Sequence, residues 1–294
     1  MVMKNEFITL KSRNLEVTFS TLGAGIHRIL FDGIDMLMTP VNDEDYLKPS
    51  CYYGKTIGRI CGRIAVKNQF GYQLQGNEKE NSLHGGFDGI STKIFDYKKQ
   101  DNKVIFTYLS KDGEAGYPGN LNLEVEYELN DSTLLVRFFA KVDKPCVVAL
   151  TNHAYFSMGE KSTNDLKLKM DIDKFLDVDD KLMPIKYIET PKELQGVIQL
   201  SDKYKIDNYF LLKNPNISLI GKKYQMDIDS DFLGTVIFSD NWRDNIVTTL
   251  SDKGIYRGAA IEPQDDQMDR KVLQPNQEYR KFIKYTFKKL WKTK

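Results

Sequence analysis

A histidine at the end of an apolar run is the first residue in this sequence whose type and setting suggest chemistry. His153 follows Asn152 and lies between the apolar residues 147–150 and the aromatic pair Tyr155 and Phe156. Histidine is the side chain whose ordinary pKa suits proton transfer near neutral pH. A histidine at the end of a buried strand is therefore a candidate acid or base on a rigid support. The alternative is a core histidine whose ring nitrogens are both satisfied.

Composition narrows the class of protein. The chain has 294 residues, of which 41% are hydrophobic and 28% charged, and its net charge is +1. These values are typical of a soluble protein and predict neither nucleic-acid nor membrane binding. Residues 1–6 lack an apolar signal core. The three cysteines lack CxxC spacing and are interpreted as reduced thiols, so we expect a cytoplasmic protein. The three scattered histidines make a zinc site improbable.

Alternating polarity indicates strands along most of the chain. In residues 121–129 the odd positions are apolar and the even positions polar, residues 130–132 supply a turn, and residues 133–139 return. Comparable patterns occupy residues 7–10, 15–19, 104–108, 165–172, 235–238, 246–250 and 279–287. Helical periodicity is weak throughout. The sequence therefore predicts an all-β protein, a large antiparallel β-sandwich that forms one domain over residues 1–294.

Lysines gather at the end of the chain. They are Lys284, Lys288, Lys289, Lys292 and Lys294. We interpret them as the solvated edge of a last strand, where charge discourages pairing with another chain.

Two glycine-containing segments interrupt the strand pattern in the first third of the chain. Residues 54–64 contain Arg59 and Arg63 among glycine and apolar residues, so we expect at least one guanidinium group to be half-buried and paired. The alternative is a purely structural ion pair with a carboxylate. Residues 81–86 place His84 before two glycines, which permit a tight turn and the close approach of a ligand.

Three further segments carry turn signals or acidic groups. Residues 112–120 form a turn-rich loop that we interpret as scaffold. Glu262 follows apolar residues and precedes Pro263, and a carboxylate in that setting is either salt-bridged or functional. Asp207 comes directly before a predicted strand at residues 209–212.

Six of these segments, in this order, resemble the aldose 1-epimerase family, the galactose mutarotases. The resemblance covers most of the chain and is carried by residues 58–64, 81–86, 112–120, 150–156, 207–209 and 262–264. It implies a β-sandwich of the galactose-mutarotase type that needs no cofactor and no metal. It also implies an enzyme that interconverts the α and β anomers of aldoses.

The resemblance assigns roles to particular residues. Glu262 corresponds to the general base and His153 to the general acid of the family pattern. Arg63, His84 and Asp207 correspond to residues that hold the sugar hydroxyls and the ring oxygen. The implied partner is a small sugar. The charge balance predicts no nucleic-acid or membrane partner, and the sequence leaves open whether the chain is a monomer or a homodimer.

Three departures from the family pattern would lie close to the sugar. Gly62 stands before Arg63, where the family often has asparagine, so one polar contact is expected to be lost. Residues 265–269 replace the usual Tyr-Pro-Asp-Ala continuation after Gln264, and residues 183–186 lack a Thr-Gly pair after proline. These changes affect the expected substrate preference more than the expected chemistry.

Anomer interconversion explains why two different groups are needed. Ring opening removes a proton from the C1 hydroxyl and delivers one to the ring oxygen, and these atoms lie on different sides of the reacting carbon. Each positioned acid or base typically contributes about 10²–10⁴-fold to the rate. We expect Glu262 to be held ionised by Arg63, and His153 to be held protonated by a carboxylate, when substrate binds. Tyr155 and Phe156 are candidates to pack against a sugar face.

Three other functions remain open at the level of sequence. A hexose-6-phosphate epimerase would need a basic cluster at the pocket rim, for which Lys55, Arg59 and Lys181 are candidates. A glycosidase would use Glu262 and Asp207 as its two carboxylates, although histidines suit reversible proton transfer better. A sugar-binding module without catalysis is the third.

Overall fold

One large antiparallel sheet dominates the molecule. The computed structural model describes residues 4–242, 245–250 and 254–290. The sheet has 14 strands. Along its main path they are β5 (Leu37–Met38), β15 (Tyr155–Phe156), β22 (Ala259–Gln264), β21 (Gly234–Phe238), β19 (Asp207–Ile220), β20 (Tyr224–Ser230), β24 (Tyr279–Lys289), β12 (Thr133–Val142), β11 (Leu121–Asn130), β10 (Lys103–Ser110) and β9 (Asp96–Lys99). Three more strands extend it beyond β19: β16 (Lys167–Val178), β17 (Pro184–Ile188) and β18 (Val197–Gln199).

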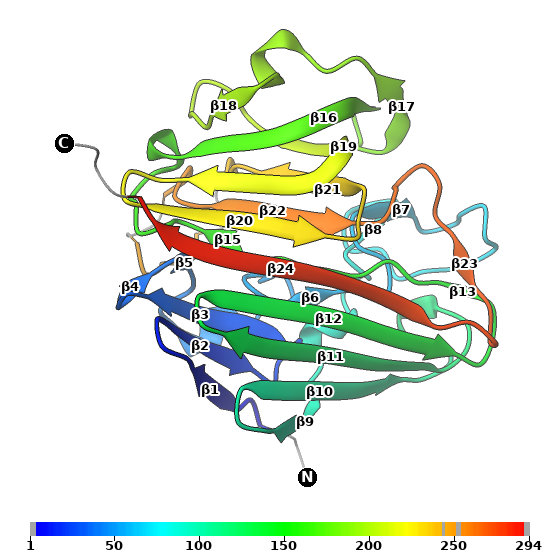
Figure 1. Cartoon of the computed structure of the whole chain (residues 1–294). Helices are drawn as coiled ribbons and strands as arrows, with labels where there is room; N and C mark the ends of the chain where they lie inside the picture. Colours follow the sequence, from blue (N-terminus) through cyan, green and yellow to red (C-terminus); the bar gives the residue numbers. More distant parts are fainter. Residues whose placement is uncertain (1–3, 243–244, 251–253, 291–294) are drawn as a thin grey trace.

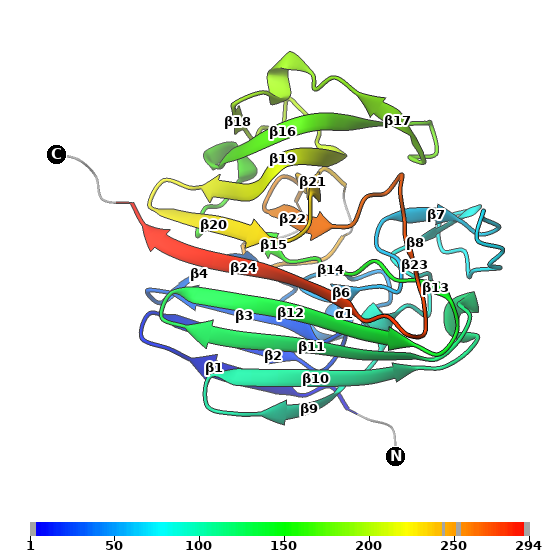
Figure 2. The ribbon, with the colours of Figure 1, turned by 45° about the vertical axis from the view of Figure 1, so that its right-hand side comes forward.

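A second, smaller sheet packs against the large one. Its strands are β1 (Phe7–Lys11), β2 (Leu15–Ser20), β3 (Gly25–Phe31) and β4 (Ile34–Asp35). Figures 1 and 2 show these blue strands lying against the green strands β10 to β12 and the red strand β24. The Phe19 ring of β2 lies 4.5 Å from the Tyr127 ring of β11, and the Phe31 ring of β3 lies 5.9 Å from the Phe287 ring of β24. The core therefore fills the space between two sheets, and the predicted all-β sandwich is confirmed.

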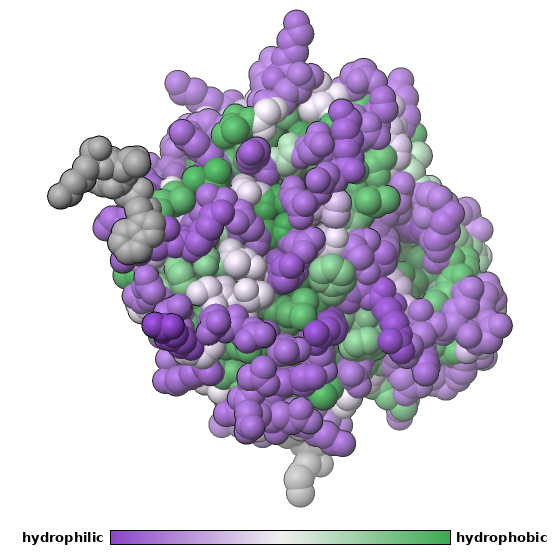
Figure 3. All heavy atoms as spheres, viewed as in Figure 1, coloured by the Kyte–Doolittle hydropathy of each residue, from purple (hydrophilic) through white to green (hydrophobic). Residues whose placement is uncertain are grey.

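Alternation places the core residues as the sequence predicted. In β11 the odd positions from Leu121 to Leu129 are buried, while Asn122 is exposed. Figure 3 shows the corresponding outer surface, where polar residues predominate and hydrophobic ones are scattered among them. The strand predicted at residues 246–250 is wrong, because that segment contributes only an isolated bridge between Thr248 and Pro40.

The last strand is not an edge, so the interpretation of its lysines is wrong. β24 lies between β20 and β12 within the sheet. The ammonium group of Lys284 lies 2.7 Å from a carboxylate oxygen of Asp229, and that of Lys288 lies 2.7 Å from Asp227. These lysines make cross-strand ion pairs with β20. Lys292 and Lys294 lie outside the described residues.

Short two-stranded ladders connect the sheets to the loops that carry polar residues. They are β6 (Thr56–Ile57) with β14 (Thr151–Asn152), β7 (Arg63–Ala65) with β8 (Asn81–Leu83), and β13 (Cys146–Val147) with β23 (Val272–Leu273). The described helices are α1 (Asp43–Tyr46) and the 3₁₀ turns η1 (Ile90–Thr92), η2 (Glu114–Gly116), η3 (Thr163–Asp165) and η4 (Lys192–Leu194). Among the described residues, none of these helices has the length and apolar character needed to cross a membrane. All three cysteines are buried.

Candidate active site

His153 is fixed by strand pairing on both sides of it. It lies between β14 and β15, and its side chain is almost completely buried. Its backbone N–H donates to the carbonyl of Lys55 at 3.0 Å, and its carbonyl accepts from Gly54 N–H at 2.9 Å. The neighbouring Asn152 donates its side-chain amide to the Gly54 carbonyl at 2.7 Å. The imidazole is therefore held on a rigid segment, as the sequence predicted.

Glu262 reaches the same place from the strand beside this segment. β22 pairs with β15 through Ala260 and Tyr155, and Thr151 of β14 donates its hydroxyl to the carbonyl of Pro263. Glu262 lies between Ala260 and Pro263 and is therefore opposite His153. The Glu262 Oε1 atom lies 3.3 Å from His153 Nε2. Two residues far apart in the sequence thus form one buried acid–base pair.

The β7–β8 ladder brings Arg63 and His84 together. Arg63 begins β7 and pairs with Leu83 at the end of β8, which puts the next residue, His84, beside it. The backbone N–H of Gly62 donates to the ring atom Nδ1 of His84 at 3.3 Å. In return, the backbone N–H of His84 donates to the Gly62 carbonyl at 3.1 Å. The turn after His84 requires glycine, because a Cβ on Gly85 would lie 2.1 Å from the backbone oxygen of Gly58.

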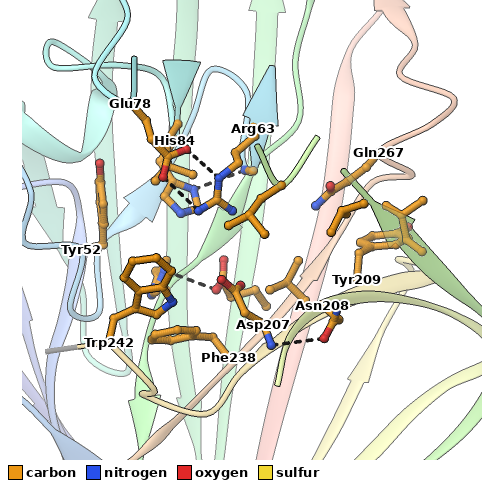
Figure 4. Close-up of a pocket in the computed structure, with 18 of the residues that line it drawn as sticks. Tyr52, Arg63, Glu78, His84, Asp207, Asn208, Tyr209, Phe238, Trp242 and Gln267 are labelled. Carbon is orange, nitrogen blue, oxygen red and sulfur yellow. Dashed lines mark hydrogen bonds and ion pairs between the residues drawn. The ribbon is translucent and has the colours of Figure 1, made fainter. Parts of the chain in front are cut away.

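All five residues predicted for the site line one cavity of about 260 Å³. Asp207, the first residue of β19, is partly buried and lies across the cavity from Arg63 (Figure 4). The His84 and His153 ring centres are 5.2 Å apart with their planes near perpendicular. The volume suits a small ligand rather than a polymer.

Burial favours the uncharged forms of the two facing groups. It lowers the pKa of His153 to about 4. Burial, followed by the charge of Asp207, raises the pKa of Glu262 well above its ordinary value, and the opposing effect of Arg63 is smaller. The ligand-free pocket thus favours a neutral Glu262 and a neutral His153, while the ionised and protonated forms expected with substrate bound stay a prediction. The reason for the neutral forms is that the free-energy cost of removing the charged forms of both groups from water exceeds the stabilisation that nearby charges provide.

Burial also favours the uncharged forms of His84 and Asp207. Burial first, then the proximity of His153 and Arg63, holds the pKa of His84 well below its ordinary value. Burial also raises the pKa of Asp207, while Arg63 opposes the rise. Because Nδ1 of His84 accepts from the Gly62 N–H, the neutral ring carries its proton on Nε2 and is a donor there.

Arg63 also has a partner that sequence reasoning missed. Its Nε and Nη2 atoms donate to the two carboxylate oxygens of Glu78 at 2.6 and 3.1 Å. Glu78 itself lines the cavity, and Figure 4 shows it beside Arg63. In the sequence it lies in the charged run 78–80, which is indistinguishable from a solvated turn. The expected half-buried arginine is thus confirmed, and its carboxylate bridge forms part of the pocket.

Apart from Gly62 and Tyr155, the other lining residues carried no sequence signal of their own. The ring of Tyr52 packs against both histidines, with ring centres 4.8 Å from His84 and 5.8 Å from His153. Tyr155 lines the cavity, whereas Phe156 is fully buried outside its lining. The rest of the wall consists of Leu83, Leu176, Val178, Leu182, Asn208, Tyr209, Val236, Phe238, Trp242 and Gln267.

The basic cluster considered for a phosphate group does not form. The ammonium group of Lys55 is buried and donates to the Tyr46 carbonyl at 2.8 Å, while Lys181 pairs with Glu80. Arg59 is buried and donates to the backbone carbonyls of residues 110, 111, 118 and 119. Loop 112–120 therefore accepts from Arg59 as part of the scaffold. Among the described lining residues, Arg63 is the one lysine or arginine.

Within the part of the chain that the structure describes, no group of three or more His, Cys, Asp or Glu side chains is placed to bind a metal ion. The polar groups that converge on the cavity are the acid–base pair, His84, Arg63 with Glu78, and Asp207. This set can exchange protons with a bound ligand and can donate to and accept from hydroxyl groups.

Sequence comparison finds relatives that are named galactose mutarotase and aldose 1-epimerase. Bovine galactose mutarotase is 30% identical over 270 residues, which cover 80% of this chain and 79% of the bovine protein. Human galactose mutarotase is 38% identical over 149 residues, 48% of this chain and 43% of the human protein. Aldose 1-epimerase of Escherichia coli K12 is 35% identical over 51% of this chain and 46% of its own length. The alignment thus spans less than half of the human and bacterial proteins and most of the bovine one.

Solved structures share the fold over nearly the whole chain. An aldose epimerase homologue from Caenorhabditis elegans superposes with a TM-score of 0.89 at 22% identity, covering 98% of this chain and 100% of that one. A galactose 1-epimerase from Lactobacillus acidophilus gives 0.84 at 24% identity, covering 98% and 99%. The sequence model described as aldose 1-epimerase matches residues 6–286. With this match over nearly all of its length, the chain belongs to the aldose 1-epimerase family.

Proposed function

We propose that this protein interconverts the α and β anomers of an aldose such as galactose or glucose. The observation that carries the proposal is the pair of His153 and Glu262, whose facing atoms lie 3.3 Å apart in the wall of the cavity. The relatives named galactose mutarotase and aldose 1-epimerase support the same class of substrate. We take residues 1–294 to act as one domain, and the three cysteines, few in number and without CxxC spacing, are consistent with the proposed cytoplasmic location.

The reaction needs two proton transfers and one bond cleavage. Glu262 takes the proton of the C1 hydroxyl while His153 gives a proton to the ring oxygen. The C1–O5 bond breaks, its electron pair stays on the oxygen, and the C1 hydroxyl becomes an aldehyde. After rotation about C1–C2 the aldehyde presents its other face, and the two transfers run in reverse. Both groups return to their starting forms, so the cycle is balanced.

The starting protonation state follows from the pair itself. Burial raises the pKa of Glu262 and lowers that of His153, so it favours the form of the free pair with one proton on the carboxyl group. Moving this proton from Glu262 to His153 across 3.3 Å gives the carboxylate and imidazolium that ring opening uses. Hydrogen bonds from the sugar hydroxyls to the pair favour these charged forms.

Three residues are assigned to holding the sugar. Arg63 donates from its guanidinium group, and the bridge to Glu78 fixes the plane of that group. His84 donates from Nε2, since its Nδ1 is occupied by the Gly62 N–H. Asp207 accepts from hydroxyls across the cavity. Because these groups position the ring relative to the acid–base pair, their loss weakens both binding and rate.

Polarimetry tests the proposal directly. Freshly dissolved α-galactose and α-glucose are followed in parallel with and without the protein, together with an aryl galactoside. We expect faster approach to anomeric equilibrium for the free sugars and no release of the aryl group. Release of the aryl group would select the glycosidase instead. Binding of galactose without faster mutarotation would select a sugar-binding module.

A further inference from the structure

Two departures from the family pattern meet inside the pocket. Gly62 comes just before Arg63, and Gln267 lies on the loop after β22, yet their positions are adjacent in space. A Cβ built on Gly62 would lie 2.9 Å from Nε2 and 3.3 Å from Cδ of Gln267. The carboxamide of Gln267 therefore occupies the space that a side chain at position 62 would take. Figure 4 shows this carboxamide directed toward the middle of the pocket.

The loop that carries Gln267 is held in place by its neighbours. The hydroxyl of Tyr279 donates to Asp265 at 2.7 Å. Asp266 accepts from the hydroxyl of Tyr187 at 2.5 Å and from the backbone N–H of Met268 at 2.8 Å. These contacts come from two strands, β24 and β17, and from the loop itself. Gln267 is therefore presented by an ordered support rather than by a free loop.

Hydrogen bonds between two side-chain amides distinguish the oxygen from the nitrogen of the Gln267 carboxamide. The side-chain N–H of Gln264 donates to the Glu262 carbonyl at 3.3 Å, so its Oε1 faces away from that carbonyl. This Oε1 accepts from Gln267 Nε2 at 3.2 Å and from Cys61 Sγ at 3.2 Å. One N–H of Gln267 is thus used. Within the described residues, its second N–H and its Oε1 have no protein partner and border the cavity.

We infer that Gln267 is a specificity-determining residue that hydrogen-bonds a hydroxyl of the bound aldose on the Arg63 side of the pocket. This hydrogen bond takes the place of the polar contact that a side chain at position 62 would make and that Gly62 cannot make. Gln267 is half-buried in the free pocket. When a sugar covers it, an amide with unused hydrogen-bonding capacity discriminates against a ligand without the matching hydroxyl, because the amide then stays unpaired. The inference rests on the proposed function for its ligand class.

Monodeoxy sugars identify the contacted hydroxyl. We would measure kcat/KM by polarimetry for galactose and its 2-, 3-, 4- and 6-deoxy forms, with wild type and with Gln267→Ala. At one position, wild type should lose about tenfold on removal of the hydroxyl, as expected for one hydrogen bond, and Gln267→Ala should lose much less. Equal losses in both proteins at every position would overturn the inference.

A reciprocal exchange provides a second test. Asparagine tolerates the left-handed backbone of Gly62, whose φ is +71°. Gly62→Asn alone should raise KM for galactose, since its Cβ meets the Gln267 amide, and adding Gln267→Ala should restore it. Additive losses would contradict the inferred exchange. Met268→Ala, on the same loop and outside the pocket lining, is the matched control and should leave KM unchanged.

The readouts separate this inference from the proposed function. Failure of wild type to accelerate mutarotation of any sugar would refute the proposed reaction. The same cycle can then be run on binding, with quenching of the fluorescence of Trp242 at the pocket. Removal of one particular sugar hydroxyl should weaken the activity or the binding of wild type and not of Gln267→Ala. This result supports the contact whether polarimetry or fluorescence is used. Gln267→Glu, which keeps the size and loses the N–H donors, shows whether donation is the relevant interaction.

Discussion

Nε2 of His153 and Oε1 of Glu262 lie 3.3 Å apart, and both side chains are almost completely buried. Because the pair is close and shielded from water, the proton equilibria of the two groups are coupled, and burial favours the form with one proton on the pair. Adding a second proton requires a pH below the His153 pKa of about 4. Removing the single proton requires a pH above the raised pKa of Glu262.

The pH dependence of activity should reflect this coupled pair. We expect kcat/KM for galactose to fall on the acid side near pH 4, where His153 gains its proton. The acid limb should not lie near pH 6.5, the ordinary histidine value, because burial lowers the pKa of His153. An alkaline fall follows loss of the Glu262 proton, whose pKa burial raises. Polarimetry at each pH, corrected for spontaneous mutarotation, would contradict this if the acid limb had its midpoint near 6.5 rather than near 4.

Removing either member of the pair should abolish most of the catalysis. Glu262→Gln and His153→Asn each remove one proton-transfer group, and we expect kcat to fall about 10²–10⁴-fold. His27→Asn is the matched control, since His27 lies outside the pocket lining. Thermal unfolding of each variant checks that the fold persists. A variant that unfolds normally and keeps its full kcat would exclude that residue from its assigned role.

The Arg63–Glu78 bridge should act mainly on substrate binding. Glu78→Gln loosens the guanidinium group that Glu78 holds by two hydrogen bonds, so we expect KM to rise about tenfold with a smaller change in kcat. Arg63→Lys should cost less in the Glu78→Gln background than in wild type, because the bridge is already lost. Glu80→Gln, at an exposed ion pair with Lys181, is the control. Additive effects would argue against positioning through the bridge.

Phosphorylated sugars should be poor substrates. The described lining contains Glu78, Asp207 and Glu262 but a single arginine, Arg63, which Glu78 already pairs. A phosphate dianion therefore meets several acidic groups with little compensating positive charge, and contacts between like charges cost several kcal/mol. We expect kcat/KM for galactose 6-phosphate to be at least about 100-fold below that for galactose. Comparable values would imply that a cation outside the described pocket binds the phosphate.

Arg59 should matter for stability and not for binding. Its guanidinium group donates to four backbone carbonyls and to the Ser110 hydroxyl, all in a buried setting. Arg59→Met leaves these acceptors unpaired, so we expect the free energy of unfolding to drop by about 3 kcal/mol or more. Urea denaturation measures the loss. KM for galactose should be unchanged in the folded fraction, because Arg59 does not line the cavity.

The sequence by itself determined the fold class and the types of the candidate site residues. Period-two alternation, as in β11, reports which face of a strand is buried, and this signal is local. The types of the five predicted site residues were readable for the same reason, since chemistry depends on side-chain type. Their presence in one cavity is what the structure adds, while their roles remain proposals.

Only the tertiary structure decided which groups meet and which charges they carry. β24 proved to be central because β20 and β12 pair with it, and sequence periodicity carries no information on strand order. Glu78 and Gln267 entered the pocket through long-range contacts with Arg63 and Gly62, which local patterns do not encode. The neutral state of the His153–Glu262 pair likewise arises from burial, a property of the assembled fold, which here outweighs the nearby arginine.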